Sequence, residues 1–136
     1  MQITRETDYA IRCILYLSSR TERTVMVDEI ASQMMVPKSF LSKILQKLVK
    51  VGVVKSFRGV KGGFQLDRDP NDITLLDVIE AIEGTIVLNA CALDSAVCAF
   101  SGTCAVHPVW VKLRAEFNEM LRSYNFADIT LVKLQE

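Results

Sequence analysis

The sequence lacks an apolar run long enough to cross a membrane. The longest apolar stretch near its start, residues 10–17, is interrupted by Arg12, whereas a membrane-spanning helix needs about 20 apolar residues. A signal peptide is also missing, because Glu6 and Asp8 lie where such a peptide would be basic. We therefore expect a cytoplasmic protein without a membrane partner.

Aromatic residues are few, at 7%, and the net charge is zero. Half of the residues are hydrophobic and 24% are charged, a balance far from the composition of disordered chains. The length of 136 residues corresponds to about one domain. Composition thus excludes a disordered chain and two large independent folds.

The zero net charge hides a division between the two halves of the chain. Residues 1–68 carry 12 bases and 6 acids, whereas residues 69–136 carry 4 bases and 10 acids. The bases concentrate further in residues 38–68, where eight bases meet a single acid, Asp67. Such asymmetry indicates that the first half binds a polyanion.

Three helices are predicted in the basic half, over residues 4–19, over residues 28–35 and from Pro37 to Gly52. Apolar residues recur there at intervals of about three and four residues, which is helical spacing, and proline is favoured at the first position of a helix. The third helix has one apolar stripe, formed by Leu41, Ile44, Leu45, Leu48 and Val49.

The opposite face of this third helix is polar and contains no acid. Two strand-like runs follow, residues 53–57 and 64–66, joined by a glycine-rich tip. This order predicts a winged helix-turn-helix that binds double-stranded DNA, with the helix in the major groove and the basic tip near the minor groove. The expected DNA-binding residues are Lys38, Ser39, Ser42, Lys43, Gln46, Lys47, Arg58 and Lys61.

Two other interpretations apply to this half of the chain. A protein-interaction module without nucleic acid stays open. A phosphate-binding loop is disfavoured, because the glycines join two strand-like runs and no G-x-x-x-x-G-K-[ST] pattern is present.

The acidic half is expected to contain two helices and a loop. Thr74 and Asp77 predict a capping pair for a helix over residues 74–84, and a last helix is expected to start at Pro108. The apolar seam of this last helix fits either contact between two copies of the chain or core packing. Its members are Trp110, Leu113, Phe117, Leu121 and Tyr124.

The expected fold class is therefore mainly α with a small β wing. Residues 1–69 form the winged helix-turn-helix region, and residues 70–136 form a cysteine loop and a C-terminal dimerisation helix. The two regions are expected to make one compact domain.

The loop between the last two helices contains three cysteines and the only histidine of the chain: Cys91, Cys98, Cys104 and His107. In a reducing compartment such a cluster favours metal binding or thiol chemistry over disulfides. Structural zinc sites usually contain a tight C-x₂₋₄-C turn, which is absent here, whereas iron-sulfur clusters tolerate wider spacing. The spacing favours an iron-sulfur cluster and leaves zinc, a redox thiol pair and metal-free thiols open.

Two further function classes are disfavoured. A thiol enzyme would have to use His107 as its base, and no orienting acid lies near it in the sequence. An electron carrier could use the same cysteines but would have little need for a basic helix face and wing. Cys13, on the apolar side of the first helix, is expected in the core.

Several short stretches resemble a known family. They are Thr7-Asp8-Tyr9-Ala10, Phe40-Leu41, Ile44-Leu45, the wing Arg58-Gly59-Val60-Lys61-Gly62-Gly63-Phe64 and the three loop cysteines. Together they resemble the IscR/NsrR/RirA group of iron-sulfur winged-helix transcription regulators over nearly the whole chain. The resemblance implies a homodimeric regulator, expected to be a repressor, whose cluster senses iron, redox state or nitric oxide.

The resemblance also implies ligands. Cys91, Cys98 and Cys104 match the thiolate ligands, and two residues compete for the fourth position. His107 matches the IscR branch, where a histidine completes a [2Fe-2S] site, and Asp8 matches the NsrR branch, where the partner subunit offers a carboxylate to a [4Fe-4S] cluster. The first cysteine gap is one residue longer than in the IscR pattern, so the resemblance leaves the cluster type open.

Overall fold

The computed structural model describes the backbone of residues 2–134 and the side chains of residues 2–130. Its elements are α1 (Arg5–Ser18), α2 (Val27–Met34), α3 (Lys38–Lys50), β1 (Val54–Phe57), β2 (Gly63–Leu66), the 3₁₀ turn η1 (Pro70–Asp72), α4 (Leu75–Glu83), η2 (Ala90–Ala92), η3 (Ser95–Val97), α5 (His107–Arg122) and α6 (Phe126–Leu134). The predicted mainly α fold with a small β wing is confirmed. No helix within the described residues is both long and apolar enough to span a membrane.

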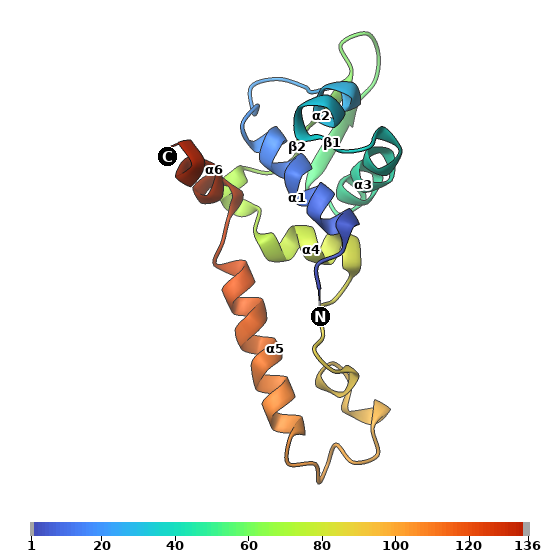
Figure 1. The fold of residues 1–136 in the computed structure, drawn as a ribbon, viewed down its shortest axis with the longest axis vertical. Helices are drawn as coiled ribbons and strands as arrows, with labels where there is room; N and C mark the ends of the chain where they lie inside the picture. Colours follow the sequence, from blue (N-terminus) through green and yellow to red (C-terminus); the bar gives the residue numbers. More distant parts are fainter. Residues whose placement is uncertain (1, 135–136) are drawn as a thin grey trace.

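A compact body contains α1 to α4, the hairpin and α6 (Figure 1). From this body, α5 and the segment with η2 and η3 extend in the same direction, so that the cysteine loop lies at the far end of the molecule (Figure 1). The cysteine loop is therefore remote from the helix-turn-helix of its own chain.

Local sequence signals set the helix boundaries. The Thr4 side chain caps α1 by accepting a hydrogen bond from the Thr7 backbone N–H at 3.2 Å. The predicted capping pair of α4 is confirmed as a reciprocal capping box between Thr74 and Asp77. The turn between α2 and α3 passes through Met35, whose left-handed φ of 54° ends α2.

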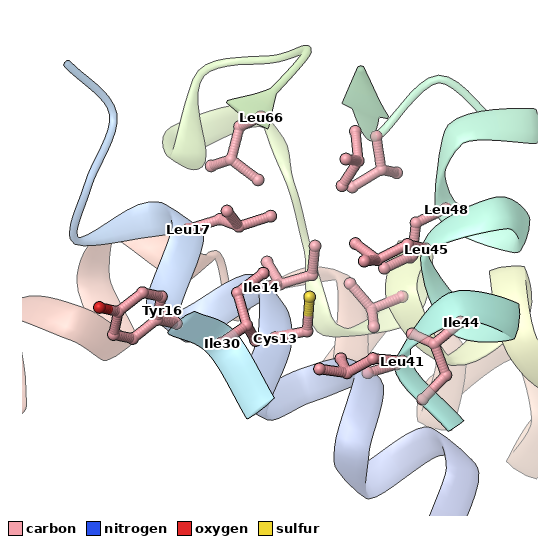
Figure 2. Packing of buried hydrophobic residues seen from close by; sticks show 14 of the residues in the cluster. Cys13, Ile14, Tyr16, Leu17, Ile30, Leu41, Ile44, Leu45, Leu48 and Leu66 are labelled. Carbon is pink, nitrogen blue, oxygen red and sulfur yellow. The ribbon is translucent and has the colours of Figure 1, made fainter. Parts of the chain in front are cut away.

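The core lies between α1 and α3. Cys13 and Ile14 of α1 face Leu41 and Leu45 of α3 (Figure 2), and all four side chains are at most 1% exposed. Burial raises the pKa of the Cys13 thiol to about 12, so this sulfur is an inert apolar group. The prediction that Cys13 belongs to the core is confirmed.

The acidic half also contributes to this core. Phe126 at the start of α6 is fully buried, as is Ile73, and the Phe126 N–H donates to the Ile73 carbonyl at 3.0 Å. Leu75 N–H donates to the Tyr124 carbonyl at 2.9 Å. These two hydrogen bonds join the residues that follow α5 to those at the start of α4, which fixes the C-terminal end of α5 to the body. No sequence pattern predicted α6.

The wing is anchored by a third strand-like segment. β1 and β2 pair antiparallel from Val54 opposite Leu66 to Phe57 opposite Gly63. Val25 and Phe64 exchange two backbone hydrogen bonds, each 2.8 Å long. Gly63 lies at this junction with φ +149°, and a Cβ atom there would lie 2.6 Å from the Val25 carbonyl oxygen.

Replacing Gly63 with alanine is therefore expected to destabilise the protein. The new methyl group must push β2 away from Val25 in a backbone conformation that side chains rarely adopt, and we expect the free energy of unfolding to fall by about 1–3 kcal/mol. Urea unfolding followed by circular dichroism measures the change. Gly102→Ala is the matched control, because a Cβ there meets no atom within 4 Å. Equal stability of the two variants would contradict this account.

Candidate functional site

The polar face of α3 is presented to solvent as the sequence predicted. Burial of Leu41, Ile44, Leu45 and Leu48 against the body leaves the opposite side chains outside. Ser39, Ser42, Lys43 and Gln46 are all exposed. Within the described residues Lys43 takes part in no ion pair, so its full charge faces outward.

Two other predicted DNA-binding lysines on α3 are paired with acids from neighbouring helices. Lys38 Nζ lies 2.6 Å from Asp28 Oδ1 of α2, and Lys47 Nζ lies 2.8 Å from Glu6 Oε1 of α1. No local sequence pattern indicates these pairs, because each acid comes from a different helix. The cationic face of α3 is therefore less positive than its sequence suggests.

Aromatic and cationic side chains hold α1 against the start of α3. The rings of Tyr9 and Phe40 meet edge to face with centroids 5.5 Å apart. Arg12 lies over the Tyr9 ring at 5.5 Å, and its guanidinium donates to the Met34 carbonyl at 3.4 Å. Arg12 also pairs with Asp8 at 2.8 Å. The first helix thus supports the turn that leads into α3.

The wing has a fixed base and an exposed tip. Arg58 and Lys61 are both exposed, and Val60 between them is fully exposed. The Thr24 hydroxyl donates to the Lys61 carbonyl at 3.2 Å, and the Gln65 amide donates to the Thr21 carbonyl at 2.6 Å. The two predicted wing cations are therefore available for an external anion.

The three loop cysteines border one hollow. Its volume is about 210 Å³, and it is lined by Asn89, Ala90, Cys91, Val97, Cys98, Cys104, Val106 and Trp110. Cys91 lies in η2, Cys98 ends η3, and Cys104 lies shortly before α5. The η2 turn packs against both η3 and α5, which brings together three thiols that are far apart in the sequence.

His107 is the first residue of α5, and its backbone N–H donates to the Cys104 carbonyl at 3.3 Å. Its ring Nδ1 is buried without a hydrogen-bond partner, as is the Ser101 hydroxyl in the same loop. A buried polar atom without a partner costs about 1–3 kcal/mol, so both groups are suited to receive a bound group. His107 itself is not among the residues that line the hollow.

The structure does not bring Asp8 to these thiols within one chain. Asp8 lies on α1, half-exposed and paired with Arg12, whereas the hollow lies in the projecting segment (Figure 1). Among the described residues, no three His, Cys, Asp or Glu side chains are close enough to hold one metal ion.

The apolar seam predicted for α5 separates into two stripes. Trp110, Phe117 and Leu121 are half-buried, and Phe117 and Leu121 border a second hollow with Ile79 of α4. The other stripe faces solvent and contains Val106, Val109, Leu113, Met120 and Tyr124, which are 40–61% exposed. No residue of α5 is fully buried, so core packing accounts for only the first stripe.

Side-chain hydrogen bonds hold α5 against the chain that enters the cysteine loop, and hold α4 against α1. Arg114 Nε donates to the Ile86 carbonyl at 3.1 Å, which joins α5 to the chain entering the cysteine loop. At the end of α4, Glu83 accepts hydrogen bonds from the hydroxyls of Thr7 and Thr4 at 2.7 and 2.9 Å. The hydrogen bond from Thr7, followed by those from Thr4, holds the pKa of Glu83 below its usual value.

Comparison with known proteins assigns the family. The Rrf2 family, described as an iron-dependent transcriptional regulator, matches residues 3–131. A putative HTH-type transcriptional regulator of Aquifex aeolicus (strain VF5) is 32% identical over 130 residues, which are 94% of this chain and 89% of that protein. The HTH-type transcriptional regulator NsrR of Shouchella clausii (strain KSM-K16) is 26% identical over 133 residues, 96% of this chain and 89% of the relative.

Among solved structures, IscR of T. potens superposes with a TM-score of 0.76 at 26% identity, over 100% of this chain and 89% of that one. The likeness covers the winged helix, the cysteine loop and the last helices, and the family that matches is one of transcriptional regulators. The chain is therefore a winged-helix transcriptional regulator of the Rrf2 family.

Proposed function

We propose that this regulator binds a double-stranded DNA operator as a homodimeric repressor and senses iron, redox state or nitric oxide through an iron-sulfur cluster. The observation that carries the proposal is the meeting of Cys91, Cys98 and Cys104 at one hollow. The exposed faces of α3 and the wing supply the DNA-binding surface. Residues 1–69 thus provide most of the DNA contacts, and residues 70–136 provide the sensor and the dimer contact.

The donor set suits a cluster better than a single zinc ion. Zinc needs four ligands converging on one point at about 2.0–2.3 Å, and the described residues offer no such preformed group. A cluster of two or four irons would share its protein ligands among several metal atoms, so its thiolates need not converge on a single point. Three thiols around one hollow fit that requirement, and the same loop region contains two buried polar atoms without a partner, Ser101 Oγ and His107 Nδ1. When bound, the cluster supplies iron atoms that exchange electrons and react with oxygen or nitric oxide.

The fourth ligand is proposed to be His107. Its Nδ1 is buried without a partner and its backbone is hydrogen-bonded to Cys104. Asp8 is the competing candidate, and it would have to come from the partner subunit after leaving its ion pair with Arg12. A histidine ligand corresponds to a [2Fe-2S] cluster and an aspartate ligand to a [4Fe-4S] cluster in the family branches that the sequence resembles.

The exposed stripe of α5 is proposed as the homodimer contact. Val106 and Val109 lie about as far from the middle of the stripe as Tyr124 and Met120. Two antiparallel copies would therefore place Val106 of one copy opposite Tyr124 of the other, and Val109 opposite Met120. Such a self-complementary patch is what a twofold interface requires. The stripe would be buried without any change in the body of either subunit.

This arrangement connects the sensor to the DNA-binding surface through residues of the chain. Cys104 and His107 fix the first turn of α5, and the hydrogen bonds at Leu75 and Phe126 fix its other end to the body. A change in how the cysteine loop is held would therefore move one α5 against its partner. The spacing of the two α3 helices would change with it, and half-sites about 34 Å apart require one defined spacing.

The experiment is to purify the full chain without oxygen and to count iron, acid-labile sulfide and zinc per chain. DNA fragments are then selected from a random library with this protein, and affinity for them is measured before and after removal of the cluster. We expect iron and sulfide in equal amounts and at least a tenfold change in operator affinity, or about 1.4 kcal/mol. A single zinc with no sulfide, or unchanged affinity at fixed salt, would contradict the sensing mechanism.

A further inference from the structure

The two paired lysines of α3 differ in how their acids are held. The Glu6 side chain is 32% exposed and the Asp28 side chain is 70% exposed. Glu6 lies in the first turn of α1, where the positive end of a helix stabilises a carboxylate. The contact between Tyr9 and Phe40 fixes this end of α1 against α3. Glu6 is therefore a positioned group on α3, and not a mobile surface acid.

Glu6 also borders the exposed polar face of α3, whose side chains are expected to contact DNA bases. It lines a hollow of about 210 Å³ together with Ser39, Phe40 and Lys43. Its Oε1 atom accepts a hydrogen bond from Lys47 Nζ at 2.8 Å. A carboxylate at this place lies among the side chains expected to contact DNA, where a phosphate group would meet a negative charge.

The ion pair between Glu6 and Lys47 changes how α3 interacts with the DNA backbone. Each lysine that neutralises a phosphate releases counterions and steepens the dependence of log affinity on log salt by about 0.9. A lysine already neutralised by a carboxylate adds little to this sequence-independent attraction. Specificity is a difference between affinities, and a repulsive group can raise it by weakening the wrong complex.

We infer that Glu6 is a specificity-determining residue: it cancels the charge of Lys47, weakens binding of α3 to phosphates and leaves recognition to the base-reading side chains. This inference rests on the proposed function. Those side chains are Ser39, Ser42, Lys43 and Gln46. Glu6 is the one acid from α1 that pairs with α3 in the part of the chain that the structure describes.

The test compares Glu6→Gln with the unaltered chain on a random-sequence duplex and on a duplex selected from a random library, over a series of salt concentrations. Freed Lys47 is expected to raise affinity for the random duplex about threefold to tenfold for each protomer and to steepen its salt dependence by about 0.9. Affinity for the selected duplex is expected to rise less, so the ratio of the two affinities falls.

Matched variants separate this effect from a general change of charge. Glu119→Gln removes one negative charge from an ion pair with Arg122 on α5, 2.7 Å long, and is expected to leave the salt dependence unchanged. Lys47→Gln in the Glu6→Gln background removes both charges of the pair and should return the salt dependence to that of the unaltered chain. Lys43→Gln, which removes an unpaired lysine, should lower the salt dependence by about 0.9 for each protomer.

Unchanged salt dependence in a folded Glu6→Gln variant would overturn the inference while leaving DNA binding intact. If that variant does not fold, the Glu6→Gln/Lys47→Met double variant decides: a salt dependence equal to that of the unaltered chain is expected for a neutral pair, and one lower by about 0.9 for each protomer would show that Lys47 is not neutralised. Failure of the unaltered chain to bind any duplex in a salt-dependent way would overturn the proposed function and this inference together.

Discussion

Substitution of Cys91, Cys98 or Cys104 by alanine is expected to remove nearly all iron from the protein as purified without oxygen. The three thiols border one hollow, and each would supply one bond to the cluster. Loss of a group that merely orients a metal ligand typically lowers metal affinity about 10–100-fold, so loss of a ligand itself should exceed this range. Iron per chain and visible absorption measure the result.

Cys13→Ala is the matched control for these variants. Cys13 is fully buried in the core, and its thiol has a pKa raised to about 12, so it offers no thiolate at neutral pH. This variant should keep its iron and lose some stability, because it leaves a small cavity between α1 and α3. Retention of iron by any of the three loop variants would contradict the proposed ligand set.

The same measurement distinguishes the two candidates for the fourth ligand. His107→Ala should alter the visible spectrum and lower iron content if the histidine binds the cluster, whereas Asp8→Asn should then leave both unchanged. The reverse result would assign the carboxylate. Asp8→Asn also breaks the ion pair with Arg12, which is solvent-exposed and contributes only about 0–1 kcal/mol, so a folding defect should not obscure the comparison.

Sequence periodicity was sufficient for the parts of the fold where one face is buried. The apolar stripe of α3, the capping box of α4 and the glycine-rich wing each depend on residues close together in the chain. Contacts between distant segments could not be predicted in this way. α6 has no clear polar face, and its place depends on the burial of Phe126 in the core and on the packing of α6 against α1, which no local pattern encodes.

In the candidate sites, too, features set by local sequence could be predicted, and features set by contacts between distant segments could not. The polar face of α3 could be predicted because it is the reverse of a buried stripe. The pairing of Lys38 and Lys47 could not, because Asp28 and Glu6 come from other helices and meet α3 only in the folded chain. The cysteines were found from their spacing, but their meeting at one hollow depends on the packing of η2 against α5.

The α5 seam shows how one sequence pattern can serve two purposes. The predicted seam mixed residues that face the body, such as Phe117, with residues that face solvent, such as Leu113. Dimerisation and core packing were both consistent with it because the two stripes are adjacent on the helix. Only the tertiary position of α4 separates them.

Substitutions in the exposed stripe of α5 are expected to have a large effect on the homodimer. A Leu113→Glu/Met120→Glu double variant is expected to weaken the homodimer at least a thousandfold, equivalent to about 4 kcal/mol. Each buried side chain of this size contributes about 1.5–3 kcal/mol, both copies lose two of them, and the new carboxylates would be buried near one another. Sedimentation velocity measures the dissociation constant.

Folding of the single chain should survive this change, because Leu113 and Met120 are 40% and 61% exposed within one chain. Ala115→Glu adds a charge to an exposed position on another side of α5 and should leave the dimer intact. Since two linked half-site contacts raise overall affinity about 10²–10⁴-fold, the double variant should lose operator affinity by a similar factor and keep its iron. A monomer with full operator affinity would separate the α5 stripe from DNA recognition, and a dimer of unchanged strength would place the subunit contact elsewhere.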